Sequence, residues 1–221
     1  MNIARFIFNP FQENTYVLWD DTCECVIVDA GNYNSGENEA LAGFIKDKGL
    51  HPVMAVNTHG HVDHILGVPY MKSNFGADFA LHSEDNFLVE TAPEHGRIYG
   101  FNITEAPSPD IDLKGMGEIR FGNTVMRVIH TPGHTPGHVC FYESEGKALF
   151  SGDTLFKESI GRTDLPGGDY GWIMRSIIDY ILPLGEEVVF YPGHGPESTL
   201  GHEMLYNPFV TEVLRGDVTP L

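Results

Sequence analysis

Short apolar runs and polar separators follow one another through the first part of the chain. Short runs rich in β-branched and aromatic residues lie at 3–8, 15–19 and 25–29, and Asn, Pro, Asp and Gly separate them. This pattern is typical of strands joined by turns. A helical spacing of apolar residues follows at 37–48, and Gly49 is a stop signal for that helix.

The same mixture of strand and helix patterns continues toward the end of the chain. We expect further strands at 53–56, 78–81, 118–121, 124–129, 139–143, 148–150 and 188–191. Helical patterns occupy 63–74 and 170–182, the second with isoleucines four residues apart on one face. We expect Ser83 to cap another helix and a short helical tail to close the chain. Runs of strands followed by helices predict an α/β (α+β) protein in which two sheets pack together with helices outside.

Length and composition fit one soluble domain. The chain has 221 residues, of which 42% are hydrophobic and 20% charged, and it shows no repeat, low-complexity tract or linker. A chain of this length can bury one large core. We therefore expect a single domain over residues 1–221.

The charge of the chain excludes some partners. The chain has 13 Lys and Arg residues and 31 Asp and Glu residues, which gives a formal net charge of −18. Such a surface repels phosphate backbones and anionic membranes, so we expect neither nucleic acid nor a membrane as a partner. A small anionic substrate held by one local cation remains compatible with this charge.

The N-terminal sequence and the cysteines predict a cytoplasmic protein. The first residues lack the charged start and apolar run of a signal peptide, and no apolar stretch is long enough to span a bilayer. The three cysteines form no CxxC motif and suggest no disulfide framework. The sequence leaves the oligomeric state open.

The segment THGHVDH carries the strongest chemical signal. It places His59, His61, Asp63 and His64 directly after a predicted buried strand. Because side chains alternate along an extended segment, His59 and His61 should point the same way. Asp63 and His64 fall where the helix begins and should face a second point nearby. The alternative is a polar helix start with scattered histidines.

Three more predicted strands end in similar motifs. TPGH, SGDT and YPGHGP place His134, Asp153 and His194 on glycine-containing turns. Each motif alone is compatible with an ordinary turn, but a sandwich brings strand ends to one rim, so the four together indicate one site. Imidazole and carboxylate without thiolate suit zinc, iron or manganese.

These motifs resemble the metallo-β-lactamase superfamily. THGHVDH, TPGHTPGH, SGDTLF and YPGHGP occur in that order between Thr58 and Pro196. The segments GRTDLPGGD, STLG and YNPF are similar to the glyoxalase II (hydroxyacylglutathione hydrolase) branch, particularly its short bacterial members. The resemblance implies a four-layer αβ/βα sandwich with metals at one edge.

The resemblance also implies roles for individual residues, with two divalent ions as cofactors, zinc first and iron or manganese as alternatives. His59, His61 and His134 would hold one ion; Asp63, His64 and His194 the other; and Asp153 would bridge both. Asp29 corresponds to a buried aspartate that orients a ligand histidine, although an ordinary turn residue is an equal alternative.

The implied activity is hydrolysis of a small-molecule thioester. Two ions with a bridging ligand lower the pKa of shared water, and the resulting hydroxide attacks the carbonyl. Asp63 would orient this nucleophile, and Asp153, where many β-lactamases of this fold have cysteine, favours a close metal pair. Arg162 would meet a glutathione carboxylate, or it is a surface loop charge. Full-length relatives have a longer helical C-terminal region than this chain, which ends at Leu221, so we expect much of the glutathione surface to be absent.

Other functions compatible with this sequence are a persulfide dioxygenase with a single iron, a lactone or β-lactam hydrolase, and a non-catalytic metal-binding domain. The charge disfavours a nuclease. Six histidines match no ligand position, and we expect them to be structural or on the surface, with His138 a contact of the site. They are His51, His82, His95, His130, His138 and His202.

Overall fold

The computed structural model describes residues 1–216, and two six-stranded sheets form its centre. The first sheet contains, in order, β1 (Asn2–Phe8), β2 (Glu13–Trp19), β3 (Glu24–Val28), β4 (His51–Val56), β5 (Asp78–Leu81) and β6 (Ile111–Asp112). The second contains β14 (Ser198–Thr199), β13 (Val189–Pro192), β10 (Ala148–Gly152), β9 (Val139–Glu143), β8 (Thr124–His130) and β7 (Glu118–Phe121). A separate ribbon pairs β11 (Leu155–Phe156) with β12 (Ser159–Ile160). The first sheet is antiparallel from β1 to β3 and parallel from β3 to β6, whereas the second sheet is antiparallel except for the parallel pair of β10 and β13.

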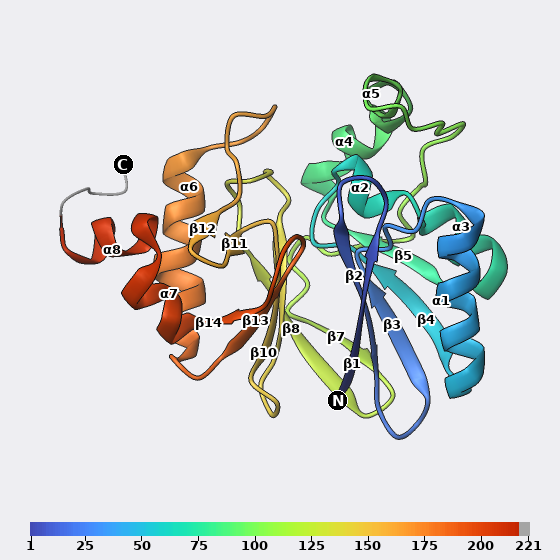
Figure 1. Ribbon diagram of the computed structural model, residues 1–221, viewed down its shortest axis with the longest axis horizontal. Helices are drawn as coiled ribbons and strands as arrows, with labels where there is room; N and C mark the ends of the chain where they lie inside the picture. Colours follow the sequence, from blue (N-terminus) through green and yellow to red (C-terminus); the bar gives the residue numbers. More distant parts are fainter. Residues whose placement is uncertain (217–221) are drawn as a thin grey trace.

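Helices cover the outer faces of both sheets (Figure 1). They are α1 (Ser35–Lys48), α2 (Val62–Ile65), α3 (Val68–Phe75), η1 (Ser83–Asp85), α4 (Asn86–Glu90), α5 (Ala92–Ile98), α6 (Tyr170–Arg175), η2 (Ser176–Ile181), η3 (Leu182–Leu184), α7 (Leu200–Tyr206) and α8 (Pro208–Leu214). α1 and α3 lie outside the first sheet, α6 and α7 outside the second, and α2, α4 and α5 gather at one rim. Within residues 1–216, no helix has both the length and the apolar character needed to cross a membrane.

The alternation of side chains along the strands produces the layers. In β2, Tyr16 and Leu18 face the core between the sheets, whereas Val17 faces the helices of the first sheet. In β9, Phe141 lies in the core between the sheets and Cys140 in the core beneath α6. Since both faces of these strands are buried, each sheet needs a partner on each side. The result is the expected order of helix, sheet, sheet and helix.

α1 illustrates how local sequence fixes an element. The Asn34 side chain accepts a hydrogen bond from the Glu37 backbone N–H, which satisfies a free donor of the first turn. Gly49 ends the helix with φ of 65°, a left-handed conformation that costs glycine little. The predicted stop at Gly49 is confirmed, and the helix begins two residues earlier than expected.

The single helix expected at 63–74 is wrong, because the chain forms α2 and α3 with a break at Gly67. The Gly67 N–H donates to the Ala30 carbonyl at 2.7 Å instead of to the preceding turn. Pro69, near the start of α3, has no N–H to continue a helix from α2.

The segment expected as one helix at 170–182 stays helical but changes type. α6 passes into the π-helical turn η2 and then the tight turn η3. Ile173, Ile177 and Ile181 are buried beneath it, as their spacing predicts.

The expected cap at Ser83 is wrong. The His82 side chain accepts the hydrogen bond from the Glu84 N–H, and the helical segment after it is short and interrupted.

Asp20 joins the two sheets at the end of the sandwich where the β2–β3 and β7–β8 turns meet. Its carboxylate accepts hydrogen bonds from Thr22 in its own turn and from the Asn123 N–H and Thr124 hydroxyl in the other. Burial opposes ionisation, but these hydrogen bonds outweigh it and lower the pKa of Asp20 to about 2.

We predict that Asp20→Ala lowers the free energy of unfolding at pH 7 by about 1–3 kcal/mol, because hydrogen bonds to a charged group are lost. The folded-state pKa is depressed, so the stabilisation is complete above the unfolded pKa of about 4 and disappears as the pH falls through about 2. Urea unfolding of the wild type, Asp20→Ala and the exposed neighbour control Asp21→Ala between pH 7 and pH 2 measures this. A difference between wild type and Asp20→Ala that stays constant with pH would contradict the assignment.

Candidate metal centre

The predicted ligand residues meet at one rim of the sandwich, where α2 lies (Figure 1). They come from the ends of four strands and from the first turn of α2. His59 and His61 follow β4, Asp63 and His64 lie in α2, and His134, Asp153 and His194 follow β8, β10 and β13. Both sheets therefore contribute to one cluster, as the convergence of the strand ends predicts.

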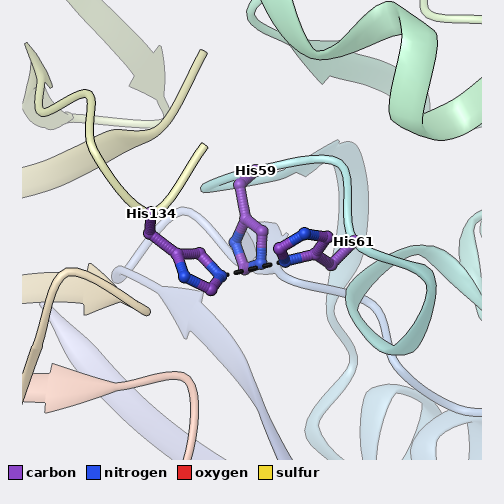
Figure 2. Close-up of side chains that lie close together, drawn as sticks. All are labelled: His59, His61 and His134. Atoms are coloured by element: carbon purple, nitrogen blue, oxygen red, sulfur yellow. Dashed lines mark hydrogen bonds between the residues drawn. The ribbon is translucent and has the colours of Figure 1, made fainter. Parts of the chain in front are cut away.

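Three histidines form a first donor group. Figure 2 shows the rings of His59, His61 and His134 turned toward one another. One nitrogen from each ring lies within 4.8 Å of the others, and His61 Nδ1 is 2.9 Å from His134 Nε2. The ring centroids of His59 and His61 are 4.8 Å apart, so these two side chains do point the same way.

A second donor group lies beside the first. Asp63, His64 and His194 also place one ligand atom each within 4.8 Å of the others. Asp63 Oδ2 is 3.2 Å from His194 Nε2 and 3.6 Å from His64 Nε2. The turn from the extended loop into α2 gives Asp63 and His64 this different orientation, as expected.

Asp153 lies between the two groups. Its Oδ1 is 3.6 Å from His64 Nε2, and its Oδ2 is 3.6 Å from His134 Nε2 and 3.7 Å from His194 Nε2. Glycine is required beside it, because a Cβ at Gly193 would collide with Asp153 Oδ1. The one carboxylate thus approaches members of both donor groups.

Contacts behind the cluster orient four of the histidine rings. Nδ1 is hydrogen-bonded to Thr58 Oγ1 in His59 at 3.0 Å, to the Arg162 carbonyl in His134 at 2.8 Å and to the Phe11 carbonyl in His194 at 3.1 Å, whereas His64 Nδ1 lies 3.1 Å from Asp29 Oδ2 as an ion-pair contact. An Nδ1–H that donates to a carbonyl leaves Nε2 with a free lone pair, which here faces the cluster. His61 instead presents Nδ1.

Asp29 serves both roles considered for it. It follows β3 with φ of 53°, so it is a turn residue in a left-handed conformation. Its carboxylate also accepts bonds from the Thr58 N–H and hydroxyl, both at 2.7 Å, and lies against His64. Asp29 therefore fixes the start of the ligand loop and the ring of one of its histidines.

Burial keeps the first donor group neutral. It lowers the pKa of His59 well below the ordinary value, that of His61 to about 3 and that of His134 to about 4. Neighbouring imidazoles act in the same direction on His59 and His61. A neutral imidazole has the free lone pair that metal coordination needs.

Charge governs the second donor group. Burial would lower the pKa of His64, but the carboxylates of Asp63, Asp153 and Asp29 raise it well above its usual value. Burial would raise the pKa of Asp63, but the charge of His64 and the hydrogen bond from His194 lower it below its ordinary range. The carboxylates therefore favour positive charge at this point, which a bound cation would supply in place of the proton on His64.

The donor atoms fit divalent metal ions. Among residues 1–216, His59 Nε2, His64 Nε2 and Asp153 Oδ1 are buried without a hydrogen-bond partner. A buried polar atom without a partner is costly, and these three all face the cluster. Neutral imidazole nitrogen with carboxylate oxygen is a donor set typical of zinc and of iron or manganese.

Asp85 is a site residue that the sequence analysis missed. It lies two residues after Ser83 and is compatible with an ordinary helix start, but its side chain is fully buried and faces the ligand loops. It accepts hydrogen bonds from the Gly60 N–H at 2.9 Å, the Thr135 hydroxyl at 2.7 Å and the Gly137 N–H at 2.6 Å. One carboxylate therefore ties the loop of His59 and His61 to the loop of His134.

His138 also supports the cluster, as expected of a contact of the site. Its Nε2 accepts a hydrogen bond from the Asp153 N–H at 3.1 Å, and its Nδ1 lies by the hydroxyls of Thr131 and Thr154. The ring stacks against His59 with centroids 5.2 Å apart. His138 thereby positions the backbone of Asp153.

A separate group of His82, Glu84 and His130 also brings ligand-type atoms together. The two rings stack almost parallel, with centroids 4.5 Å apart. His82 Nδ1 accepts from the Glu84 N–H, and His130 Nε2 donates to the Pro136 carbonyl. Both histidines thus have structural hydrogen bonds.

A cavity of about 630 Å³ opens from the ligand cluster. Asp63, Asp153 and Arg162 are among the residues that line it. Arg162 donates from Nε and one terminal nitrogen to the two oxygens of Asp164, at 2.7 and 2.9 Å, and both side chains are exposed. The predicted basic residue therefore does lie at the cavity, already paired with a carboxylate.

The sequence is similar to known metallo-hydrolases. A family model described as the metallo-beta-lactamase superfamily matches residues 8–194. The hydroxyacylglutathione hydrolase GloC of Haemophilus influenzae is 38% identical over 212 residues, which cover 95% of this chain and 98% of the relative. The probable metallo-hydrolase YqgX of Bacillus subtilis is 35% identical over 95% of this chain and 98% of its own length.

Solved structures share the fold. The B3 metallo-beta-lactamase BLEG-1 is 39% identical, with a TM-score of 0.88 over 95% of this chain and all of the other. TTHA1623, solved in a di-iron-bound form, is 36% identical, with a TM-score of 0.83 over 93% of this chain and 99% of the other. These similarities bear out the four-layer architecture and the superfamily that the motifs indicated.

We predict that Asp85→Ala lowers the free energy of unfolding by about 2–4 kcal/mol, because it leaves buried N–H donors unpaired. The free energy of unfolding of Asp85→Asn should lie between those of the wild type and Asp85→Ala, since the one amide oxygen can still accept a hydrogen bond. Glu84→Ala is the matched control, because its side chain makes an exposed ion pair with Lys114. Denaturant unfolding together with metal content measures the effect, and equal midpoints for Asp85→Ala and Glu84→Ala would refute the link between the loops.

Proposed function

This chain belongs to the metallo-beta-lactamase superfamily, and from that membership and its ligand cluster we propose that it is a two-metal hydrolase of thioesters. The observation that carries the proposal is the position of Asp153. Its two carboxylate oxygens approach histidines of both donor groups, so one side chain is placed to join two ion sites. A persulfide dioxygenase with a single iron would need no side chain that joins two ion sites.

The assignment of ligands follows the two donor groups. His59, His61 and His134 would hold one ion, Asp63, His64 and His194 the other, and Asp153 would bridge them. We propose zinc as the native metal. Iron is the main alternative, because TTHA1623 has a di-iron form at 36% identity, and manganese suits the same donors.

The bound ions would supply water of lowered pKa and polarisation of the thioester carbonyl. Asp63, kept ionised by its lowered pKa, accepts a hydrogen bond from the attacking water and orients it toward the acyl carbon. The new C–O bond forms, the C–S bond breaks with its electron pair on sulfur, and the released proton goes to solvent. Because a thiolate leaves readily, the site needs no strong general acid.

The relatives support this substrate class. Hydroxyacylglutathione hydrolase GloC is 38% identical across nearly the whole of both chains. β-Lactam hydrolysis is the second candidate, because the B3 metallo-beta-lactamase BLEG-1 is 39% identical over a similar span. Assays of S-lactoylglutathione and of a chromogenic cephalosporin on one metal-loaded preparation separate the two. Oxygen consumption with glutathione persulfide, together with elemental analysis, tests the dioxygenase.

We predict that Asp153→Ala binds fewer than two metal ions per chain and that thioester turnover falls at least about 100-fold, because an ion bridge is lost. Asp47→Ala, an exposed carboxylate on α1, is the control and should retain metal and activity. Elemental analysis and initial rates measure both effects. A variant Asp153→Ala with two metals and full turnover would remove the bridging role.

We predict that Arg162→Ala raises KM for S-lactoylglutathione about two- to fivefold and changes kcat less, because an exposed ion pair contributes up to about 1 kcal/mol. Asp164→Asn should lower this KM, since it frees the guanidinium from its partner. For the lactoyl thioester of N-acetylcysteamine, a carrier without charge, neither substitution should change KM. The control is Arg97→Ala, which removes an exposed arginine of α5 and should leave KM unchanged. An equal shift of KM for both carriers in Arg162→Ala would mean that Arg162 does not recognise charge.

A further inference from the structure

Apolar side chains cover one side of the cavity that opens from the ligand cluster. They come from the β1–β2 turn, from α4 and from α5 with the residue after it. We call this set the apolar wall: Phe11, Leu88, Ala92, Ile98 and Tyr99.

The apolar wall presents large side chains to solvent next to the reacting centre. Ile98 is 74% exposed, Tyr99 53% and Phe11 39%. The Phe11 ring packs edge-on against Tyr99 and Phe101, with centroids 5.3 and 5.4 Å apart, which holds it in place. Apolar surface gathered in a cavity beside convergent polar groups is typical of a binding site for an apolar part of a ligand.

The opposite side of the cavity is also largely apolar, but it carries a cationic side chain. It carries Phe156, Ile160, Leu165 and Pro166, but also Arg162, the one Lys or Arg among the described residues that line the cavity. The lining residues of α5 and the position after it add two polar side chains that are not predicted ligands, those of Tyr99 and His95, and neither is a Lys or Arg. A polar thiol carrier is therefore better placed toward Arg162, which leaves the acyl group against the apolar wall.

We infer that the apolar wall receives the acyl group of the substrate and selects bulky apolar acyl groups, aromatic or branched, over hydroxyacyl groups. This inference rests on the proposed thioester hydrolysis. An apolar acyl group gains by leaving water for such a surface, whereas a hydroxyl group placed there gives up hydrogen bonds to water. Substrate preference then follows from the side chains of the β1–β2 turn and α5, not from the metal ligands.

The first test compares thioesters that differ in the acyl group but release the same thiol. Phenylacetyl, acetyl and lactoyl thioesters are prepared with glutathione and with N-acetylcysteamine, and kcat/KM is measured with the metal-loaded protein. We expect phenylacetyl to exceed lactoyl by at least about tenfold with both carriers, the scale of discrimination that an apolar pocket provides. Hydrolysis in which lactoyl equals or exceeds phenylacetyl overturns the inference and leaves the proposed function intact. Failure to hydrolyse any of the six compounds overturns the proposed function and the inference with it.

The second test assigns the preference to the wall. Ile98→Ser should reduce the phenylacetyl-to-acetyl ratio of kcat/KM about five- to tenfold, mainly through KM for phenylacetyl. Leu205→Ser, a 68% exposed leucine on α7, is the matched control and should leave the ratio unchanged. Thermal unfolding of each variant verifies that it is folded. An unchanged ratio in folded Ile98→Ser would show that the wall does not select the acyl group.

Discussion

The structure depends on one constraint: the lone pairs of imidazole nitrogens and carboxylate oxygens meet at one buried point. Five imidazoles and two carboxylates lie within a few ångströms of one another, and several of their ligand atoms have no other partner within residues 1–216. Such an arrangement is unfavourable for a core built from apolar packing alone. It is favourable where cations balance the carboxylates and accept the lone pairs, so the chemistry of the donor atoms and the stability of the rim are coupled.

The fold provides this convergence by bringing loops from both sheets to one rim. Four strands end there, and the ligands follow those ends directly, so the well-packed core beneath fixes their backbone. Asp29, Asp85 and His138 then connect the ligand loops to one another: Asp29 holds Thr58 and His64, Asp85 joins Gly60 to the loop of His134, and His138 holds the Asp153 backbone. Each link is a buried side chain bonded to backbone or to a ring nitrogen. The geometry of the centre is therefore a property of the whole rim.

Sequence alone predicted the strands and the ligand cluster, because both have local signatures. Runs of β-branched and aromatic residues between turn residues indicate the strands, and the spacing of His59 and His61 suffices to place two rings on one side of an extended loop. Asp85 has no such signature, since its partners lie 25 to 52 residues away and the residue is compatible with an ordinary helix start. α5 contains Gly96 in its interior, which disfavours a helix locally, and it packs beside Phe101 and Ile103. The strands β6, β11, β12 and β14 have two residues each, which is too few to form a recognisable run of strand-type residues.

The metal ligands and the walls of the cavity belong to different kinds of structure. The ligands follow strands of the two sheets, whereas Ile98, Tyr99 and Leu165 lie at the end of α5 or in connections between elements. A substitution in such a connection alters the cavity without displacing a ligand, so the acyl or lactam group that fits can change while the centre remains. Two relatives of nearly equal identity to this chain, 38% and 39%, bear the names of a hydroxyacylglutathione hydrolase and a β-lactamase. Within this architecture, the predicted ligands belong to the rim of the sandwich, and much of the cavity lining belongs to the loops above it.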